Sequence, residues 1–214
     1  MEIFLLNTAS KEIVIAQLLP AAARDMRNTT DGWMFNWRRH FSLPGAKAFK
    51  VITGQNDIQG LMIFQLVDGE PTMAYLESAP ENRGDGKAYD YVAGSLIAYA
   101  CRLSLIHGKD WHQGFLSFQC MDEEVIRVYH DKYGAVRLDD TWMFIEPPQG
   151  TILIEKYIER NGDTNANDLE VIGALEESEN GEDNQGEPEI NNQEERGEDH
   201  EIQEDEQQHV QPEE

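Results

Sequence analysis

The feature that most constrains how this chain can fold is a change of composition near residue 160. Residues 161–214 contain 20 acidic residues and one basic residue, which gives −19 of the total formal charge of −24. This stretch has no Phe, Tyr, Trp, Met or Cys, and its nine aliphatic residues lie scattered. This small apolar surface cannot offset the entropy that is lost when the backbone becomes ordered. We therefore expect residues 161–214, which we call the acidic segment, to be disordered. Residues 1–160 then form one folded domain, long enough for a hydrophobic core.

Composition excludes several classes of protein. The domain is mildly acidic and shows no basic surface for phosphate contacts, so we do not expect nucleic-acid binding. No apolar run approaches the roughly 20 residues of a membrane helix, and the start lacks the basic region of a secretory signal. Cys101 and Cys120 are too few for a disulfide framework or a cysteine zinc site, and His107, His112 and His130 lack metal-ligand spacing. We expect a cytoplasmic protein that needs no metal and does not contact a membrane.

Hydrophobic periodicity indicates antiparallel strands first, then strands that alternate with helices. The segments that are predicted as strands are 2–7, 12–19, 48–53, 58–67, 72–78, 115–119, 135–138, 141–146 and 151–158, where 2–7 and 12–19 could instead be one strand and a turn. The segments that are predicted as helices are 20–27, 87–107 and 122–132. Trp33 and Trp37 are interpreted as packing residues, although the wall of a pocket fits them too. This order is typical of a mixed α/β (α+β) fold.

The segment 75–90, YLESAPENRGDGKAYD, joins a strand end, a glycine-bearing loop and the start of a long helix. The first turn of a helix has unpaired N–H groups and a positive dipole end, and glycines let the backbone close around an anion. Arg83 and Lys87 add positive charge at the same place. The loop could therefore hold a phosphate group. The alternative is that Gly84 and Gly86 are ordinary turn glycines.

Two well-known phosphate loops do not fit this segment, because Glu81 and Tyr89 stand where the Walker and dinucleotide motifs need glycine. The run from Arg83 to Ala88, R-G-D-G-K-A, instead resembles the acetyl-CoA pyrophosphate loop (Gln/Arg-x-x-Gly-x-Gly/Ala) of the GNAT N-acetyltransferase superfamily. A meander before it, a long helix after it and a second helix ending V-Y-H-D-K-Y-G-A are similar to the same family. The resemblance covers residues 48–146 and implies a GNAT-like acyl-CoA N-acyltransferase fold, with acetyl-CoA as co-substrate.

The resemblance also implies the site residues. It places Glu77 as the general base and Tyr129 as the general acid, with Tyr133 as the fallback. The alternatives are that Glu77 is a solvated strand-end carboxylate and that Tyr129 only packs against the sheet. The residues that the resemblance assigns to acetyl-CoA are Leu76, Ser78, Arg83, Gly84, Asp85, Gly86, Lys87, Ala88 and Asp122. Lys87 and Asp85 depart from the usual loop, which indicates a divergent member.

These observations predict an acyl-CoA-dependent N-acyltransferase, with acetyl-CoA as donor and an amine, on a small molecule or a protein, as acceptor. The acidic charge would attract a cationic acceptor. The alternative function is a catalytically inactive GNAT-fold interaction protein whose acidic segment recruits a basic protein partner. The two functions differ in whether the loop of residues 83–88 binds CoA.

Overall fold

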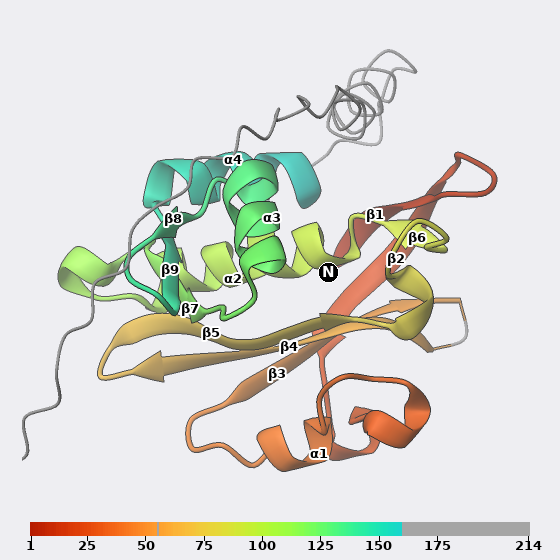
Figure 1. Cartoon of the computed structure of the whole chain (residues 1–214), viewed down its shortest axis with the longest axis horizontal. Coiled ribbons are helices and arrows are strands. Elements are labelled where there is room, and N and C mark those ends of the chain that lie inside the picture. Colours follow the sequence, from red (N-terminus) through yellow and green to blue (C-terminus); the bar gives the residue numbers. More distant parts are fainter. Residues whose placement is uncertain (55, 160–214) are drawn as a thin grey trace, which may run out of the picture. The chain divides into compact units, whose positions relative to one another are not determined.

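The computed structural model describes residues 1–54 and 56–159, and the predicted disorder of the acidic segment concerns residues outside this part. The strands are β1 (Glu2–Asn7), β2 (Ile13–Pro20), β3 (Lys47–Thr53), β4 (Asp57–Val67), β5 (Glu70–Ser78), β6 (Tyr89–Asp90), β7 (Leu116–Gln119), β8 (Val136–Arg137) and β9 (Trp142–Ile145). The α-helices are α1 (Trp37–His40), α2 (Val92–His107), α3 (Glu123–Tyr133) and α4 (Pro147–Tyr157) (Figure 1). The short 3₁₀ helices are Ala23–Asp25, Thr29–Asp31, Pro80–Asn82 and Asp110–His112.

All nine of these strands belong to one sheet, in the order β6-β1-β2-β3-β4-β5-β7-β9-β8. Neighbouring strands are antiparallel except β5 and β7, which are parallel because α2 crosses over between them. The predicted meander is the β3-β4-β5 part of the sheet, and residues 2–7 and 12–19 form two strands. The sheet is therefore mixed, and the predicted mixed α/β class is confirmed.

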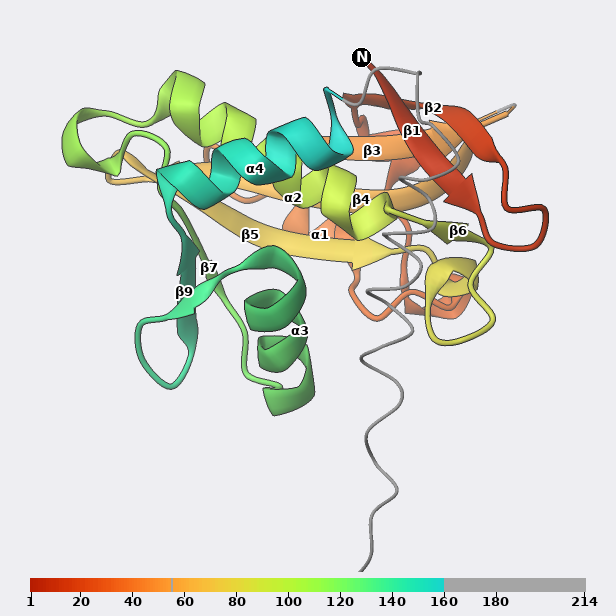
Figure 2. The same ribbon diagram turned by 90° about the horizontal axis from the view of Figure 1, so that it is seen from above.

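The two faces of the sheet are covered differently (Figures 1 and 2). The long helix α2 and, beside it, α4 lie over one face, whereas the segment 21–46 with α1 covers part of the other. Every residue of β4 from Ile58 to Phe64 is buried, as expected for a central strand with both faces covered. Trp33 and Trp37 belong to the core under α1, being 5% and 0% exposed, so the prediction that they pack is confirmed.

Helix α4 is a correction to the sequence analysis, because residues 151–158 were predicted as a strand. Pro147 stands in the first helical turn, where proline needs no N–H partner. Leu153, Ile154 and Tyr157 then fall on one face and are buried, with the helix lying against α2. The contact is close: a Cβ on Gly94 of α2 would lie 2.5 Å from the Tyr157 ring.

Two other boundaries also differ from the prediction. Helix α2 begins at Val92 and not at Lys87, because residues 89–90 form the edge strand β6, which pairs with β1. The predicted helix over residues 20–27 is a single 3₁₀ turn, since Pro20 is still part of β2. The helix that was predicted over residues 122–132 is confirmed as α3.

Candidate functional site

Strands β5 and β7 are joined at one point. Within the described residues, Thr72↔Ser117 is the single pair between them. Beyond Thr72, β5 continues to Ser78 and pairs with β4 on its other side. Backbone N–H and C=O groups on the β7-facing edge are therefore open to water or to an added strand-like ligand. Leu76 and Ser78, which the resemblance assigns to acetyl-CoA, both lie on this stretch.

Glu77 lies on the same stretch of β5, but its side chain faces the α1 segment and is enclosed by donors. The residue is 5% exposed. Its carboxylate accepts hydrogen bonds from the backbone N–H groups of Met34 and Phe35, from Trp37 Nε1 at 2.8 Å and from Arg83 Nη2. The interpretation as a solvated carboxylate is wrong. A base needs a free lone pair, so Glu77 could accept a proton only after one of these donors moves; its role as base stays a prediction.

The predicted phosphate loop does not direct its arginine outward. Arg83 donates from Nε to the Ser78 carbonyl at 3.1 Å and from Nη2 to Glu77, which ties the loop to the end of β5. Gly84 has φ of +66°, a value that glycine adopts without strain. A Cβ at Gly84 or Gly86 would meet nothing within 4 Å, so neither glycine is needed for close packing inside the protein. Whether the loop binds a ligand stays a prediction.

The first turn of α2 borders a small cavity of about 130 Å³. Its lining residues are Ser78, Asn82, Lys87, Tyr89, Asp90, Tyr91, Val92, Ala93, Lys132, Tyr133 and Tyr157. The N–H groups of Val92, Ala93 and Gly94 start the helix and have no acceptor in a preceding turn. The positive end of the helix dipole is directed at the same place. Lys87, which is ion-paired with Asp90, and Lys132 add positive charge there.

Tyr91, the residue before α2, has an unusual backbone conformation. Its φ is +74°, and it is 7% exposed. An aromatic residue in this left-handed conformation is strained by about 1–3 kcal/mol, and such strain is typical of ligand-binding sites. The Tyr91 carbonyl accepts from Ser95 N at 2.8 Å, and its ring packs on Tyr157 with the centroids 5.9 Å apart. Tyr91 was not predicted as a site residue, since no sequence signal indicates a positive φ at tyrosine.

Tyrosine rings continue from this cavity to β7. The centroid distances are 6.3 Å from Tyr157 to Tyr133, 5.9 Å from Tyr133 to Tyr129 and 4.6 Å from Tyr129 to Phe118. Tyr133 lines the cavity, whereas Tyr129 lies against Phe118 of β7. Burial raises the pKa of the Tyr129 hydroxyl above its ordinary value, so this phenol stays protonated at neutral pH. Packing of Tyr129 is therefore observed, and its role as acid stays a prediction.

A buried asparagine fixes the loop between β5 and α2. Asn82 is 7% exposed and donates from Nδ2 to the backbone and side-chain oxygens of Gln59, at 3.1 and 2.8 Å. Its Oδ1 accepts from Tyr89 N at 3.0 Å. One side chain thus joins β4, the loop and β6. The sequence analysis did not identify Asn82, because asparagine in a glycine-rich loop is typical of any turn.

The remaining predicted site residues have structural contacts. Asp122 is the N-cap of α3 and accepts from the N–H groups of Glu124 and Val125. The Lys87 carbonyl accepts from the Thr8 hydroxyl, and the Ala88 carbonyl accepts from Thr8 N at 3.0 Å. Asp85 is exposed. The structure therefore brings Ser78 and Lys87 together at the cavity and places Gly84, Asp85 and Gly86 on the exposed part of the loop.

Two further observations concern the part of the chain that the structure describes. None of its helices is both long and apolar enough to cross a membrane. Within the same residues, no group of three or more His, Cys, Asp or Glu side chains could hold a metal ion. Both cysteines are free and buried, and burial raises the pKa of the Cys101 thiol to about 12.

No protein-family model and no curated protein matches the chain. Its fold is similar to that in the crystal structure of the KacTA–DNA complex, at 13% identity, with 66% of this chain and 99% of that chain covered and a TM-score of 0.49. It is also similar to mutant forms of the spermidine/spermine N-acetyltransferase SpeG from Vibrio cholerae, at 15% identity, 64% and 96% coverage and a TM-score of 0.45. Nourseothricin acetyltransferase matches at 19% identity, 48% and 65% coverage and a TM-score of 0.35.

Proposed function

We propose that this protein is an acyl-CoA-dependent N-acyltransferase, with acetyl-CoA as the donor and an amine as the acceptor. The observation that carries the proposal is the open edge of β5, which leads to the cavity at the start of α2. An extended pantetheine arm can pair with such an edge, and a pyrophosphate can accept from the N–H groups of a helix start. The sequence resemblance to the GNAT superfamily supports the same donor.

The residues that would hold the anionic part of the donor differ from those of the predicted loop. Arg83 is engaged with Glu77 and with the Ser78 carbonyl. The N–H groups of Val92 and Ala93 are better placed, because they belong to the first turn of α2 and both residues line the cavity; Lys87, which is ion-paired with Asp90, and Lys132 line it too. We therefore assign the anion to this turn of α2, several residues after the glycine loop.

The chemistry of the proposed reaction is attack of a neutral amine on a thioester. The protein has to orient the two reactants, accept a proton from the ammonium and return a proton to the thiolate. Tyr129 and Tyr133 are both candidates for the proton donor, since both lie on the face of α3 that continues from the cavity to β7. For Glu77 we propose a positioning role, in which it holds Arg83 and the 34–37 segment. The identity of the amine stays open.

The test of this proposal is thermal stabilisation by acetyl-CoA, with CoA and ATP as comparators. A ligand that binds the folded state at 100 times its Kd stabilises by about 2.7 kcal/mol, which raises Tm by about 5–10 °C for a domain of this size. Ala93→Asp adds a carboxylate to the first turn of α2. Acidic residues there stabilise a helix, so we expect the variant to fold but to lose the acetyl-CoA shift.

The matched variant is Gly86→Asp, which adds the same charge to the exposed loop. If α2 holds the anion, Ala93→Asp abolishes the shift and Gly86→Asp weakens it less. The reverse order would return the anion to the glycine loop and keep the function. Absence of any acetyl-CoA shift in the wild-type protein would refute the proposed donor.

A second function is favoured by one observation. Glu77 and Arg83, which the resemblance assigns to catalysis and to cofactor binding, hydrogen-bond to each other and to the surrounding backbone. A catalytically inactive interaction protein that recruits a basic protein through its acidic segment would show this arrangement. It would show no acetyl-CoA shift, and its binding of the basic partner would need the acidic segment. For either function, two free cysteines fit a reducing compartment, and a cytoplasmic location is part of the proposal.

A further inference from the structure

A second cavity lies at the opposite end of β5 from the candidate functional site. It has a volume of about 450 Å³, which is within the usual range for small-molecule sites. Its lining residues are Glu70, Trp111, His112, Phe115, Ser117, Leu138, Trp142, Met143 and Phe144. Glu70 begins β5 and Ser78 ends it, so the two cavities are about 26 Å apart along the strand. They also lie on different faces of β7, because Ser117 lines this cavity while its neighbour Phe118 contacts α3.

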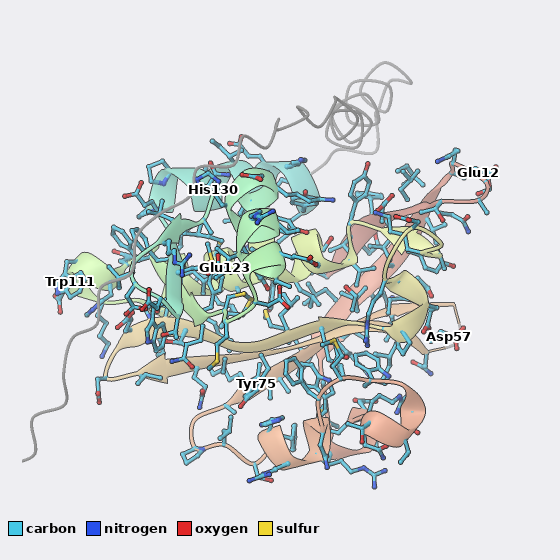
Figure 3. All side chains as sticks on the ribbon, in the orientation of Figure 1. Glu12, Asp57, Tyr75, Trp111, Glu123 and His130 are labelled. Carbon is cyan, nitrogen blue, oxygen red and sulfur yellow. The ribbon has the colours of Figure 1, made fainter. Side chains whose placement is uncertain are left out.

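Four aromatic rings make up much of the wall of this cavity. They come from the loop before β7 and from β9, and they are Trp111, Phe115, Trp142 and Phe144. The Phe115 and Phe144 rings lie 6.2 Å apart. Trp111, which is labelled in Figure 3 at one end of the domain, is 74% exposed. Within the chain the indole packs on the neighbouring His112 ring, with the centroids 3.5 Å apart, and most of its surface stays exposed. It is therefore available to cover a ligand.

The aromatic wall contains one carboxylate, that of Glu70. Its Oε1 accepts a hydrogen bond from the Ser117 hydroxyl at 2.6 Å, which orients the group. No lysine or arginine is among the lining residues, and none of the ion pairs found in the described part of the chain includes Glu70. Glu70 is half-buried, and a carboxylate that loses water beside apolar rings is stabilised by a cation. The cavity therefore has an oriented negative charge that no lysine or arginine of the described residues pairs with, and His112 is the one basic side chain among the lining residues.

The ligand chemistry that satisfies both features is an organic cation. The faces of tryptophan and phenylalanine attract alkylammonium groups, and a carboxylate adds a direct charge. An anion would be repelled by Glu70, and a neutral apolar molecule would leave that charge unpaired. We propose that this cavity binds a small alkylammonium cation of the choline type. This site is independent of the acyl-CoA proposal, since the two share no lining residue.

Choline and its uncharged isostere 3,3-dimethylbutan-1-ol test the proposal on the full chain. The two ligands have nearly the same shape and differ in charge. Binding is followed by the fluorescence of Trp111 and Trp142 and by calorimetry. We expect choline to bind at least about tenfold more tightly than the alcohol, because the alcohol has neither cation–π nor ionic attraction. Equal affinities, or no binding of choline, would overturn the proposal.

Variants assign the effect to the cavity. Glu70→Gln keeps the acceptor for Ser117, so the variant should fold, and we expect choline to bind about tenfold more weakly than to the wild type. Trp111→Ala removes an exposed ring, and we expect a loss of about two- to fivefold. The matched control is Glu12→Gln, an exposed carboxylate at the far end of the domain (Figure 3), which should change nothing. A Glu12→Gln loss equal to that of Glu70→Gln would show non-specific attraction to an acidic protein and would refute the site.

Sedimentation of the wild-type protein with and without choline tests the competing occupant, a second copy of the chain. Leu138 and Trp111 are exposed apolar residues that such a copy could cover. A dimer that Trp111→Ala dissociates, and that choline leaves unchanged, would mean that this face is a subunit interface. The cation site would then be refuted. A monomer that retains the choline preference would support it.

Discussion

Replacing Glu77 with glutamine is expected to destabilise the fold strongly. The buried carboxylate accepts from two backbone N–H groups, from the Trp37 indole and from Arg83. Glutamine keeps one acceptor oxygen and turns an NH₂ group toward donors, so about two charge-assisted bonds are lost. Each contributes about 1.5–3 kcal/mol, and the Arg83 bond counts for less because that side chain is 30% exposed. We expect the free energy of unfolding to fall by about 3–5 kcal/mol.

Urea unfolding at neutral pH measures this loss. With an m-value of about 2 kcal/mol/M, the midpoint should fall by about 2 M. Glu81→Gln is the control, since Glu81 is exposed on the neighbouring 3₁₀ turn and should change the free energy of unfolding by less than about 0.5 kcal/mol. A double-mutant cycle with Trp37→Phe should show coupling of at least about 1 kcal/mol. A loss below about 1 kcal/mol for Glu77→Gln would refute the reasoning and would return Glu77 to the role of a free base.

Two further predictions concern the core. Gly94→Ala should lower the free energy of unfolding by about 1–3 kcal/mol, because the new Cβ meets the Tyr157 ring; a thermal melt measures this loss. Gly86→Ala is the control, since its Cβ meets nothing within 4 Å and stability should not change. Equal melting temperatures for the two variants would contradict the close contact between α2 and α4. Burial acts to raise the pKa of Asp25, but hydrogen bonds from Ala22 N and Lys50 lower it overall. The ionised Asp25 carboxylate therefore stabilises the fold at neutral pH, and this stabilisation is lost as the pH falls through the depressed pKa. In urea titrations, Asp25→Asn should lower the free energy of unfolding by about 1–2 kcal/mol near pH 7 and by almost nothing near about pH 2. A loss that does not depend on pH would contradict this prediction.

Strand and helix positions were predictable where the pattern is local. The meander consists of apolar runs that are separated by clear turn formers, and Asp122 is an N-cap that the sequence shows directly. The start of α2 was not predictable in this way. Ala88 fits the helical period, but residues 89–90 pair with Leu6 and Asn7 of β1. These residues are more than 80 positions apart in the sequence, so a local pattern cannot indicate the pairing. Helix α4 was mistaken for a strand because Thr151, Ile152 and Ile154 favour strands locally. The segment is helical because this conformation lets its apolar face pack on α2.

The sequence predicts where the candidate site lies, but not the contacts that its residues make. The resemblance located the end of β5 and the start of the long helix, where the cavity lies. It could not show that Glu77 faces the 34–37 segment, since that contact joins residues about 40 positions apart. Tyr91 has no sequence signal, because its positive φ is imposed by the elements on both sides. Lys132 reaches the cavity only through the placement of α3.

The late position of α4 has a consequence for synthesis of the chain on the ribosome. Its buried residues, Leu153, Ile154 and Tyr157, cover α2, so the apolar surface of α2 stays open until α4 has emerged. In the printed sequence 57 residues follow Tyr157. At about 5–20 residues per second, their translation takes roughly 3–11 s. The chain therefore stays tethered to the ribosome for seconds after Tyr157 has been added, and α4 can dock on α2 during this time.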